Sequence, residues 1–381
     1  MFSFSRENTG LVAKWWRNID KQILFIFVFL LLLGLFFSFS STTSMMSEKM
    51  NKQTYFFFIK HLIFVSISLF LLIAISIQEK NKLIKFLIYL FLVSIVLLLL
   101  TLVVGVEIKG SKRWMGFDPL PRFQPVELVK PLFIIFVAKI IVLNEKANIY
   151  RRYLYSFLVL LLIVIILINQ PDLGQTLLLA SVWITMVFVS GFDMVILLIL
   201  GLAFLSIITL LIFFFPEKFS YVFLRIKTFM DPKAGDNFQS QKALDAIKQG
   251  GLTGQGMGEG ILKDEVPEAH TDYIIAVVSE EFGAIFVLFI VTIFLFIGYK
   301  VFNKVFSEKN EFLKLALVGL VSLLIIQTFI HIGVNTRLLP TTGMTLPFLS
   351  YGGSSLIGSS IIAGIILNFT RKDSARYSEN D

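Results

Sequence analysis

The chain contains no cysteine, only three histidines and few charged residues among its 381 positions. The absence of cysteine excludes disulfides, thiolate metal sites and thiol catalysis. Three histidines also argue against a multi-histidine metal site. Charged residues make up 16% of the chain, whereas about 25% is typical of a soluble domain.

Hydrophobic residues take the place of the missing charges. They make up 56% of the chain, 41 residues are phenylalanine and the mean hydropathy is +0.82. Several apolar runs exceed the roughly 18 residues that span a bilayer. The sequence therefore predicts an all-α polytopic membrane protein. The net charge of +8 favours contact with anionic lipid or phosphate over nucleic acid, because the basic residues lie between apolar runs.

Ten apolar runs, each bounded by polar or charged segments, are predicted to be transmembrane helices. They cover residues 22–40, 55–77, 83–107, 126–143, 153–169, 173–190, 192–215, 273–298, 312–333 and 344–369. The first run has no small-residue cleavage site, so it is expected to stay as an anchor. The chain has no strict internal repeat, which gives a repeat-built transporter no support.

The distribution of lysine and arginine orients these helices. With the N-terminus inside, the inner segments carry seventeen basic residues and the short outer loops carry seven. Basic residues concentrate on the cytoplasmic side, so both termini are predicted to be cytoplasmic. The chain then divides into a cytoplasmic segment at 1–21, a membrane domain at 22–369 and a cytoplasmic tail at 370–381.

One large loop, residues 216–272, connects the seventh and eighth predicted helices and lies outside the cytoplasm in this topology. A loop of this length in a compact protein is usually functional or disordered. Apolar residues such as Tyr221 and Leu224 interleave with basic residues such as Arg225. This pattern is typical of an ordered amphipathic segment at the membrane surface.

Asp272 lies where this loop enters the eighth predicted helix, two residues after His270. The simpler interpretation is a helix N-cap, because an aspartate at a helix start accepts hydrogen bonds from free N–H groups. The functional interpretation is a general base at the membrane–water boundary. Glu280 and Glu281 follow about two turns later and are expected to form an interhelical hydrogen bond or an ion pair.

Residues 250–260, GGLTGQGMGEG, contain six glycines. The run lacks the lysine and Ser/Thr of a nucleotide-binding loop and does not follow a strand, so that function is excluded. A flexible turn is the simplest interpretation. An alternative is a loop whose N–H groups approach a phosphate or a sugar.

The loop between the third and fourth predicted helices carries four basic residues on the outer side, where they are normally rare. These residues are Lys109, Lys112, Arg113 and Arg122. An anion in the outer leaflet, such as a lipid diphosphate, would explain them, and simple contact with lipid headgroups is the alternative. Glu127 and Lys130 follow with an i,i+3 spacing that allows an ion pair on one helix face.

Two further segments break the helical pattern: INQPDLGQT at 168–176 and RLLPTTGMTLPFLSYGGSS at 337–355. In the second, Pro340, Gly343 and Pro347 interrupt an apolar region. Irregular backbone at membrane depth is tolerated only where it is buried in protein or lines a wet cavity. We therefore expect this segment to enter an outward-facing polar cavity, with a structural kink as the alternative.

Six of these motifs, in this order, resemble the SEDS family (shape, elongation, division and sporulation) of bacterial membrane glycosyltransferases. They are GSKRW with QPVELVKP, QPDLGQT, FQSQKAL followed by GGLTGQGMGEG, PEAHTDYI, EEFG and LPTTGMTLPFLSYGGSS. The resemblance extends from Gln22 to about Arg371. RENTGLVAKWWRNID and PEAHTD favour the division branch of the family over the elongation branch.

This resemblance implies polymerisation of lipid II, a disaccharide-pentapeptide on undecaprenyl diphosphate, at the outer face of the bacterial cytoplasmic membrane. It also implies a class B penicillin-binding protein (a transpeptidase) and division regulators as partners, and location at the division septum. A divalent cation, Mg²⁺ or Mn²⁺, could assist the diphosphate, although no residues are assigned as metal ligands. The elongation-type polymerase, a lipid II flippase and a non-enzymatic scaffold are the alternatives.

The residue roles implied by the resemblance are one catalytic acid and a group of substrate-binding residues. The acid of the family's HTD motif falls on Asp272, which becomes the proposed general base. The substrate-binding candidates are Lys109, Lys112, Arg113, Trp114, Glu127, Lys130, His270, Ser350, Tyr351, Gly352 and Gly353. Two positions depart from the family pattern: Val126 stands where serine is usual, and Arg337 stands where glycine is common.

Overall fold

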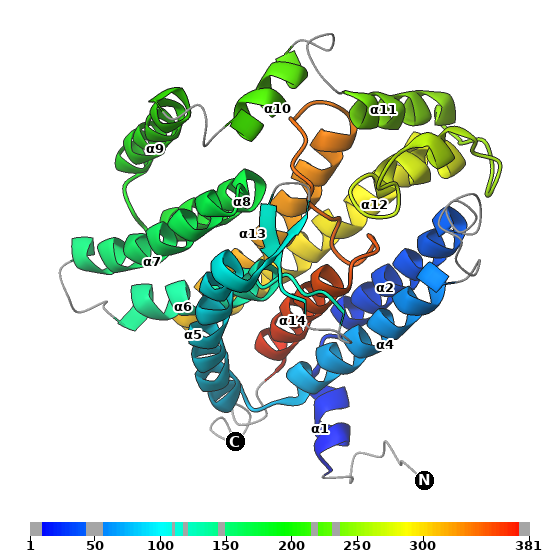
Figure 1. Cartoon of the computed structure of the whole chain (residues 1–381). Helices are drawn as coiled ribbons and strands as arrows, with labels where there is room; N and C mark the ends of the chain where they lie inside the picture. Colours follow the sequence, from blue (N-terminus) through cyan, green and yellow to red (C-terminus); the bar gives the residue numbers. More distant parts are fainter. Residues whose placement is uncertain are drawn as a thin grey trace.

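The computed structural model describes residues 10–42, 56–108, 111–116, 121–143, 149–214, 220–230 and 237–372. These residues form thirteen α-helices, one 3-10 helix and one two-stranded hairpin (Figure 1). The predicted helical membrane architecture is confirmed. The term all-α needs one correction, because the outer loop after the third long helix folds as a hairpin.

Each predicted apolar run corresponds to one helix. The ten helices are α2 (Lys21–Thr42), α4 (Phe56–Ile77), α5 (Lys80–Val104), α6 (Val126–Leu143), α7 (Ile149–Asn169), α8 (Leu173–Val189), α9 (Met194–Phe214), α12 (Ile274–Ser307), α13 (Glu311–Asn335) and α14 (Gly353–Thr370). Among the described residues, seven are long and apolar enough to cross a membrane unaided. The other three are α6, α8 and α9. Of these, α6 carries the charged residues Glu127, Lys130 and Lys139, and α8 is only 17 residues long.

The last helix begins later than predicted. The apolar run suggested a start at residue 344, but residues 336–352 are not helical and α14 begins at Gly353. Pro347 has no N–H to donate, and Gly343 and Phe348 have positive φ angles of 67° and 65°. The expected break before the last span is therefore confirmed, and it extends through Gly352.

The centre of the bundle is formed by α13 and α14, which Figure 1 shows surrounded by the other long helices. In the most apolar 18-residue stretch of α14, 89% of the residues are buried, and in that of α13 the share is 72%. Small residues allow this close packing. A Cβ atom at Gly364 would lie 2.8 Å from the Ile75 side chain of α4, and one at Gly358 would lie 2.7 Å from the Glu127 carbonyl of α6.

The outer segments that were predicted to be ordered form short elements. The hairpin pairs β1 (Val106–Ile108) with β2 (Ser111–Trp114), and the long loop contains α10 (Ser220–Met230), α11 (Phe238–Gly250) and the 3-10 helix η1 (Leu262–Glu265). At the opposite end, α1 (Leu11–Asn18) lies against α4, where the Trp15 indole N–H donates to Ser76 Oγ at 3.0 Å. The inside–outside orientation and the boundaries at 1–21 and 370–381 stay predictions.

The Gly-rich run forms backbone hydrogen bonds with α12 on both sides of a break in that helix. Gly283, inside this helix, has a φ of 79° and a ψ of 175°, so the helical hydrogen-bond pattern stops there. The carbonyls of Glu280 and Glu281 accept hydrogen bonds from the N–H groups of Gln255 and Gly256, at 2.8 and 3.0 Å. Residues after the break donate in return. The N–H groups of Ala284 and Ile285 bond to the carbonyls of Gly251 and Leu252, at 3.0 and 3.2 Å.

The carboxylates of the same two residues hold the end of the loop. Glu280 accepts from the N–H groups of Leu262 and Lys263, at 2.8 and 2.7 Å. Glu281 forms an ion pair with Lys263 and accepts from Ser40 Oγ of α2. The expected ion pair and interhelical hydrogen bond are therefore both made by Glu281. The glycines allow the loop backbone to pack directly against the backbone of α12. The loop is therefore held in place, and the flexible-turn interpretation is wrong.

Two glycines of this run provide a matched test of that role. Both Gly254 and Gly258 have a φ of 81°, but a Cβ atom at Gly254 would lie 2.2 Å from the Glu281 carbonyl oxygen, whereas one at Gly258 would meet nothing within 4 Å. Gly258→Ala should cost about 1 kcal/mol, from backbone strain alone. Gly254→Ala should cost about 3 kcal/mol, because overpacking adds to that strain. Unfolding of the two purified variants would measure the difference, and equal stabilities would show that the loop is not fixed to α12.

Candidate active site

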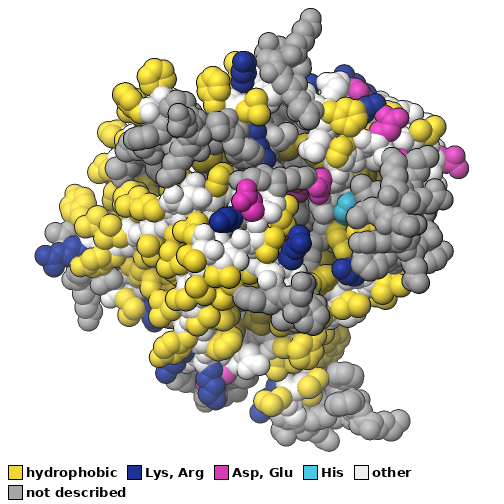
Figure 2. Space-filling view, in the orientation of Figure 1, with side chains coloured by type: hydrophobic (Ala, Val, Ile, Leu, Met, Phe, Trp, Pro, Cys, Tyr) yellow, Lys and Arg dark blue, Asp and Glu magenta, His cyan; other side chains and the backbone are white. Residues whose placement is uncertain are grey.

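The structure contains a cavity of about 570 Å³ between the hairpin, α4, α10, the start of α12 and the segment before α14. Seven predicted site residues line it: Arg113, Trp114, Glu127, Asp272, Tyr351, Gly352 and Gly353. In Figure 2, hydrophobic side chains cover most of the visible face, and acidic and basic side chains gather near its centre. The segment 337–355 supplies one wall, as expected for irregular backbone beside a polar cavity.

Asp272 lines the cavity just before α12 begins. The N-cap residue of that helix is Tyr273, and its side chain makes no capping hydrogen bond. The capping role predicted for Asp272 is therefore wrong, because the helix starts one residue later. A Cβ atom at Gly343 would lie 3.4 Å from Asp272 Oδ2, so the absence of a side chain there keeps space beside the carboxylate.

Hydrogen bonds from neighbouring elements fix the backbone that carries Asp272. Asn335, the last residue of α13, donates from Nδ2 to the Asp272 carbonyl at 3.0 Å. Ser350 Oγ donates to the Thr271 carbonyl at 2.7 Å, and the Tyr351 N–H donates to the His270 carbonyl at 2.9 Å. Ser350 and His270 do not line the cavity. They instead hold the Asp272 segment against the chain that precedes α14.

Aromatic rings close the side of the cavity next to α4. The His270 ring lies 5.6 Å from Phe57 and 5.5 Å from Tyr351, and the Tyr351 ring lies 5.5 Å from His61. Burial lowers the pKa of His270 and raises that of Tyr351. His270 is therefore neutral near pH 7, and Tyr351 keeps its proton. Neither side chain adds charge to the cavity. The charges in the cavity are those of its carboxylates, lysine and arginines.

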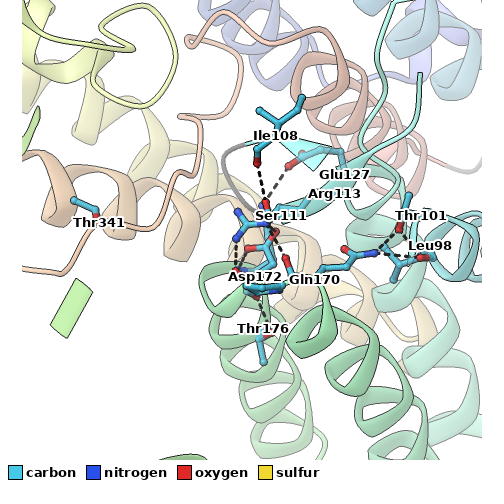
Figure 3. Close-up of polar contacts among 12 residues, drawn as sticks. Leu98, Thr101, Ile108, Ser111, Arg113, Glu127, Gln170, Asp172, Thr176 and Thr341 are labelled. Carbon is cyan, nitrogen blue, oxygen red and sulfur yellow. Dashed lines mark hydrogen bonds and ion pairs between the residues drawn. The ribbon is translucent and has the colours of Figure 1, made fainter. Parts of the chain in front are cut away.

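Arg113 links the hairpin to the turn between α7 and α8 (Figure 3). Its Nε donates to the Gln170 carbonyl at 3.2 Å and lies 3.5 Å from Asp172 Oδ2, and its Nη2 donates to the Pro171 carbonyl. The Arg113 side chain is 13% exposed. Arg113 therefore holds the outer hairpin in place and also presents a positive charge to the cavity.

Arg225 is a cavity residue that the sequence did not identify as part of the site. It projects from α10, lines the cavity and donates to the Thr341 carbonyl at 2.5 Å. Burial, together with the nearby positive charge of Arg113, lowers its pKa to about 10. Arg225 therefore remains charged near pH 7. Its sequence pattern indicated only an amphipathic surface segment, and no local motif places it near Asp272.

Glu127 and Lys130 form the predicted ion pair, with a distance of 2.9 Å between Nζ and Oε2. Their side chains are 5% and 2% exposed, and Lys130 also donates to Gln327 Oε1 of α13 at 3.1 Å. Lys130 does not line the cavity. Its ammonium group is used to neutralise Glu127 and to join α6 to α13.

Of the two remaining basic candidates, the structure describes only Lys112. Lys112 is exposed on β2 and does not line the cavity. Lys109 lies outside the described residues. The described cations that line the cavity are Arg113 and Arg122 from that loop, with Arg225 and Lys60 from α10 and α4.

The cavity carboxylates do not form a metal centre by themselves. Among the residues that the structure describes, no group of three His, Asp or Glu side chains is placed to hold a metal ion. Glu127, Glu268 and Asp272 each line the cavity, but Glu127 is paired with Lys130. Mg²⁺ is often held by one or two carboxylates together with substrate phosphates. One or two of these carboxylates could hold a divalent cation together with the phosphates of a substrate.

Arg337 and Val126, the two residues that depart from the family pattern, contact other parts of the protein and do not line the cavity. Arg337 has a φ of 57°, a region that glycine favours, and its Nη1 donates to Gln241 Oε1 of α11 at 2.8 Å. The hydrogen bond to α11 offsets part of the backbone strain. Val126 is 1% exposed at the start of α6 and belongs to the core of the bundle.

Comparison with known proteins is consistent with this arrangement. The family model described as cell cycle protein, FTSW_RODA_SPOVE, matches residues 21–375. The chain is 35% identical over 279 residues to the probable peptidoglycan glycosyltransferase FtsW of Caulobacter vibrioides, covering 72% of this chain and 69% of that protein. It is 37% identical over 275 residues to the protein of the same name from Geobacter metallireducens, covering 71% and 72%.

Solved structures have the same fold. One, described as a peptidoglycan synthase complex that coordinates polymerization and crosslinking, contains a chain with a TM-score of 0.76 and 25% identity, covering 95% of this chain and 99% of that one. The rod shape determining protein RodA of Thermus thermophilus has a TM-score of 0.69 and 25% identity, covering 93% and 97%. This chain is a multi-pass membrane protein that belongs to the FtsW/RodA/SpoVE family of cell cycle proteins.

Proposed function

We propose that this chain is a peptidoglycan glycosyltransferase of cell division that polymerises lipid II at the outer face of the bacterial cytoplasmic membrane. The observation that carries the proposal is the position of Asp272 in one cavity with Arg113 and Arg225. The curated relatives named FtsW support the reaction class and its place in division. A cavity that combines carboxylates with several cations suits this reaction.

Asp272 acts as the general base. Joining two glycan units requires a sugar hydroxyl of the acceptor to lose its proton as its oxygen attacks the anomeric carbon of the donor. The Asp272 carboxylate accepts that proton. Asn335 and Ser350, on two different elements, bond to the carbonyls of Asp272 and Thr271 and hold the backbone that carries this carboxylate.

Arg113 and Arg225 stabilise the leaving group. When the new glycosidic bond forms, the bond between the anomeric carbon and the lipid diphosphate breaks, and negative charge develops on the departing oxygen. Fixed cations near this charge lower the barrier. The two guanidiniums come from different segments of the chain, and each is held by a backbone carbonyl.

The partners and the site of action follow from the relatives. A transpeptidase of the class B penicillin-binding type is proposed as the partner, because the solved complex of a related chain is described as coordinating polymerization and crosslinking. Division regulators and location at the septum are proposed on the strength of the FtsW relatives. A divalent cation carried by the diphosphate is compatible with the cavity carboxylates.

A lipid II flippase is not favoured. Such a protein needs a site that opens to each side of the membrane, whereas Asp272, Arg113 and Arg225 all line the cavity at the end that carries the hairpin and α10. The experiment that tests the proposal uses purified protein in liposomes with fluorescent lipid II. Glycan polymer, formed alone or only with the transpeptidase, supports the proposal. Transbilayer movement without polymer would support the flippase instead.

Arg225 offers a test of the leaving-group role. Arg225→Met should lower the polymerisation rate by roughly 10²-fold, since removing one donor from a developing anion typically costs this much or more. Lys227→Met is a suitable control, because Lys227 is exposed on the same helix and does not line the cavity. If both variants kept the wild-type rate in a lipid II assay, Arg225 would have no part in leaving-group stabilisation.

A further inference from the structure

Gln175, at the start of α8, has a buried oxygen that no group among the described residues satisfies. The residue is 3% exposed and lines the cavity. Its Nε2 donates to Glu127 Oε1 at 3.4 Å, whereas its Oε1 has no hydrogen-bond partner among the described residues. Buried side-chain oxygens almost always have a partner. An unsatisfied acceptor on a cavity wall therefore indicates that a donor comes from a bound molecule.

The orientation of this amide follows from its neighbour. An ionised carboxylate only accepts hydrogen bonds, so the NH₂ group of Gln175 must face Glu127. Lys130 binds the same carboxylate, because its ammonium lies 3.0 Å from Oε1, the oxygen that also accepts from Gln175. Consequently, the Gln175 oxygen points away from the Glu127–Lys130 pair.

The N-terminus of α14 lies at the same end of the cavity. This helix of 18 residues begins at Gly353, its N-cap residue Gly352 provides no side chain, and Ser354 and Ser355 also line the cavity. The first N–H groups of a helix have no acceptor within the helix and bind oxygen atoms of ligands. The cavity wall therefore offers backbone donors as well as the Gln175 acceptor.

Three contacts connect these two features. The Gln124 N–H donates to Ser354 Oγ at 3.0 Å, which places the chain before α6 against the first turn of α14. Glu127 Oε2 would lie 3.3 Å from a Cβ atom at Gly358, in the second turn. Gln175 bonds to the same carboxylate. The free acceptor of Gln175 and the donors of α14 therefore lie on either side of Glu127.

The groups around Gln175 and the first turn of α14 favour a neutral ligand group that both donates and accepts hydrogen bonds. An anion would be repelled by the Glu127 carboxylate and by the Gln175 oxygen. A hydroxyl group also donates and accepts, but it does so through one oxygen atom, whereas the two features lie on either side of Glu127. A secondary amide matches both features, because its N–H can donate to Gln175 and its carbonyl can accept from α14.

We propose that Gln175 and the first turn of α14 form a subsite for the acetamido group of an N-acetylated sugar. This inference rests on the proposed function and deepens it, because it assigns a sugar-reading residue to a glycosyltransferase cavity. A site built to hydrogen-bond a substrate N–H rejects an analogue that lacks it much more strongly than a purely apolar pocket would. Gln175 therefore acts in specificity, whereas Asp272 acts in the reaction.

The test compares lipid II with two analogues in which the acetamido group of one sugar is replaced by an acetate ester. The ester keeps the shape and the carbonyl but has no N–H. Wild-type protein should use one of the analogues at least about tenfold less efficiently than lipid II. In Gln175→Leu this ratio should fall to within about threefold of one, because the acceptor that distinguishes the two substrates has been removed.

Gln239→Leu is the matched control, since Gln239 lines the same cavity from α11. It should keep the wild-type ratio. The proposal is overturned if wild-type protein uses both analogues as well as lipid II, or if Gln175→Leu keeps the full ratio. The wild-type comparison is decisive even if Gln175→Leu does not fold. Wild-type protein that makes no polymer from natural lipid II, with or without the transpeptidase, would refute the proposed function rather than this subsite.

Discussion

Asp272→Asn is expected to lower the rate of lipid II polymerisation by roughly 10²–10⁴-fold, the usual contribution of a general base. The amide keeps the size of the side chain but cannot accept a proton from the acceptor hydroxyl. The fold should change little, because the neighbouring elements bond to the backbone of this segment. Asn335 donates to the Asp272 carbonyl, and Ser350 donates to the Thr271 carbonyl.

The measurement is a single-turnover or initial-rate assay with labelled lipid II, together with thermal unfolding of the same preparation. Asp245→Asn is the control, because Asp245 accepts from Gln241 Nε2 on α11 and does not line the cavity. That variant should polymerise at the wild-type rate. A well-folded Asp272→Asn protein with near wild-type activity would remove the general base from the mechanism.

Lys130→Met should destabilise the protein by about 3–5 kcal/mol, because it leaves the buried Glu127 carboxylate without its cation. Both side chains are almost fully buried, so the carboxylate that loses its partner is poorly solvated. Lys130 also bonds to Gln327 of α13, so the contact between two central helices is lost as well. Denaturant or thermal unfolding in detergent micelles would measure this change.

A second lysine–glutamate pair with the same spacing is the control. Lys314 lies 2.8 Å from Glu311, but the two side chains are 31% and 58% exposed. Lys314→Met should therefore cost no more than about 1 kcal/mol. Adding Glu127→Gln to Lys130→Met should recover part of the stability, since no charge is then left buried. If Lys130→Met and Lys314→Met had equal effects, the Glu127–Lys130 pair would not be the buried pair described above.

The helices were predictable from the sequence, because only helices and closed barrels satisfy the backbone inside a bilayer. Each apolar run became one helix, and the i,i+3 spacing of Glu127 and Lys130 became an ion pair. The Pro- and Gly-rich segment before the last helix was correctly expected to break it. The exact start of that helix at Gly353 was not predictable, since the apolar run predicted at 344–369 extends into the non-helical part.

The composition of the cavity was only partly predictable. Asp272, Arg113 and Tyr351 were expected and line it, but Arg225 and Gln175 were not recognised as site residues. Their positions depend on how α10 and α8 pack against distant segments, and no local pattern encodes that packing. The same limit applies to Asp272, because its chain position alone favoured a helix cap and only the family resemblance indicated a general base.

The Gly-rich run shows why local patterns mislead. Its glycines suggested either flexibility or contact with a ligand, yet the loop exchanges backbone hydrogen bonds with both sides of the break at Gly283. The partners lie about thirty residues further along the chain. A sequence shows that glycine is present, but the reason for it depends on what approaches the backbone.

The central claim is that Asp272 lies in an outward-facing cavity that binds lipid II. The chain has no native cysteine, so Asp272→Cys gives a single reactive thiol at that position. It should react with a membrane-impermeant maleimide in intact spheroplasts, and lipid II added to the purified variant should slow the reaction. Gln249→Cys, on the exposed outer loop, should react without protection, and Ser307→Cys should react only after lysis. Reaction of Asp272→Cys only after lysis, or at a rate that lipid II does not change, would contradict the account.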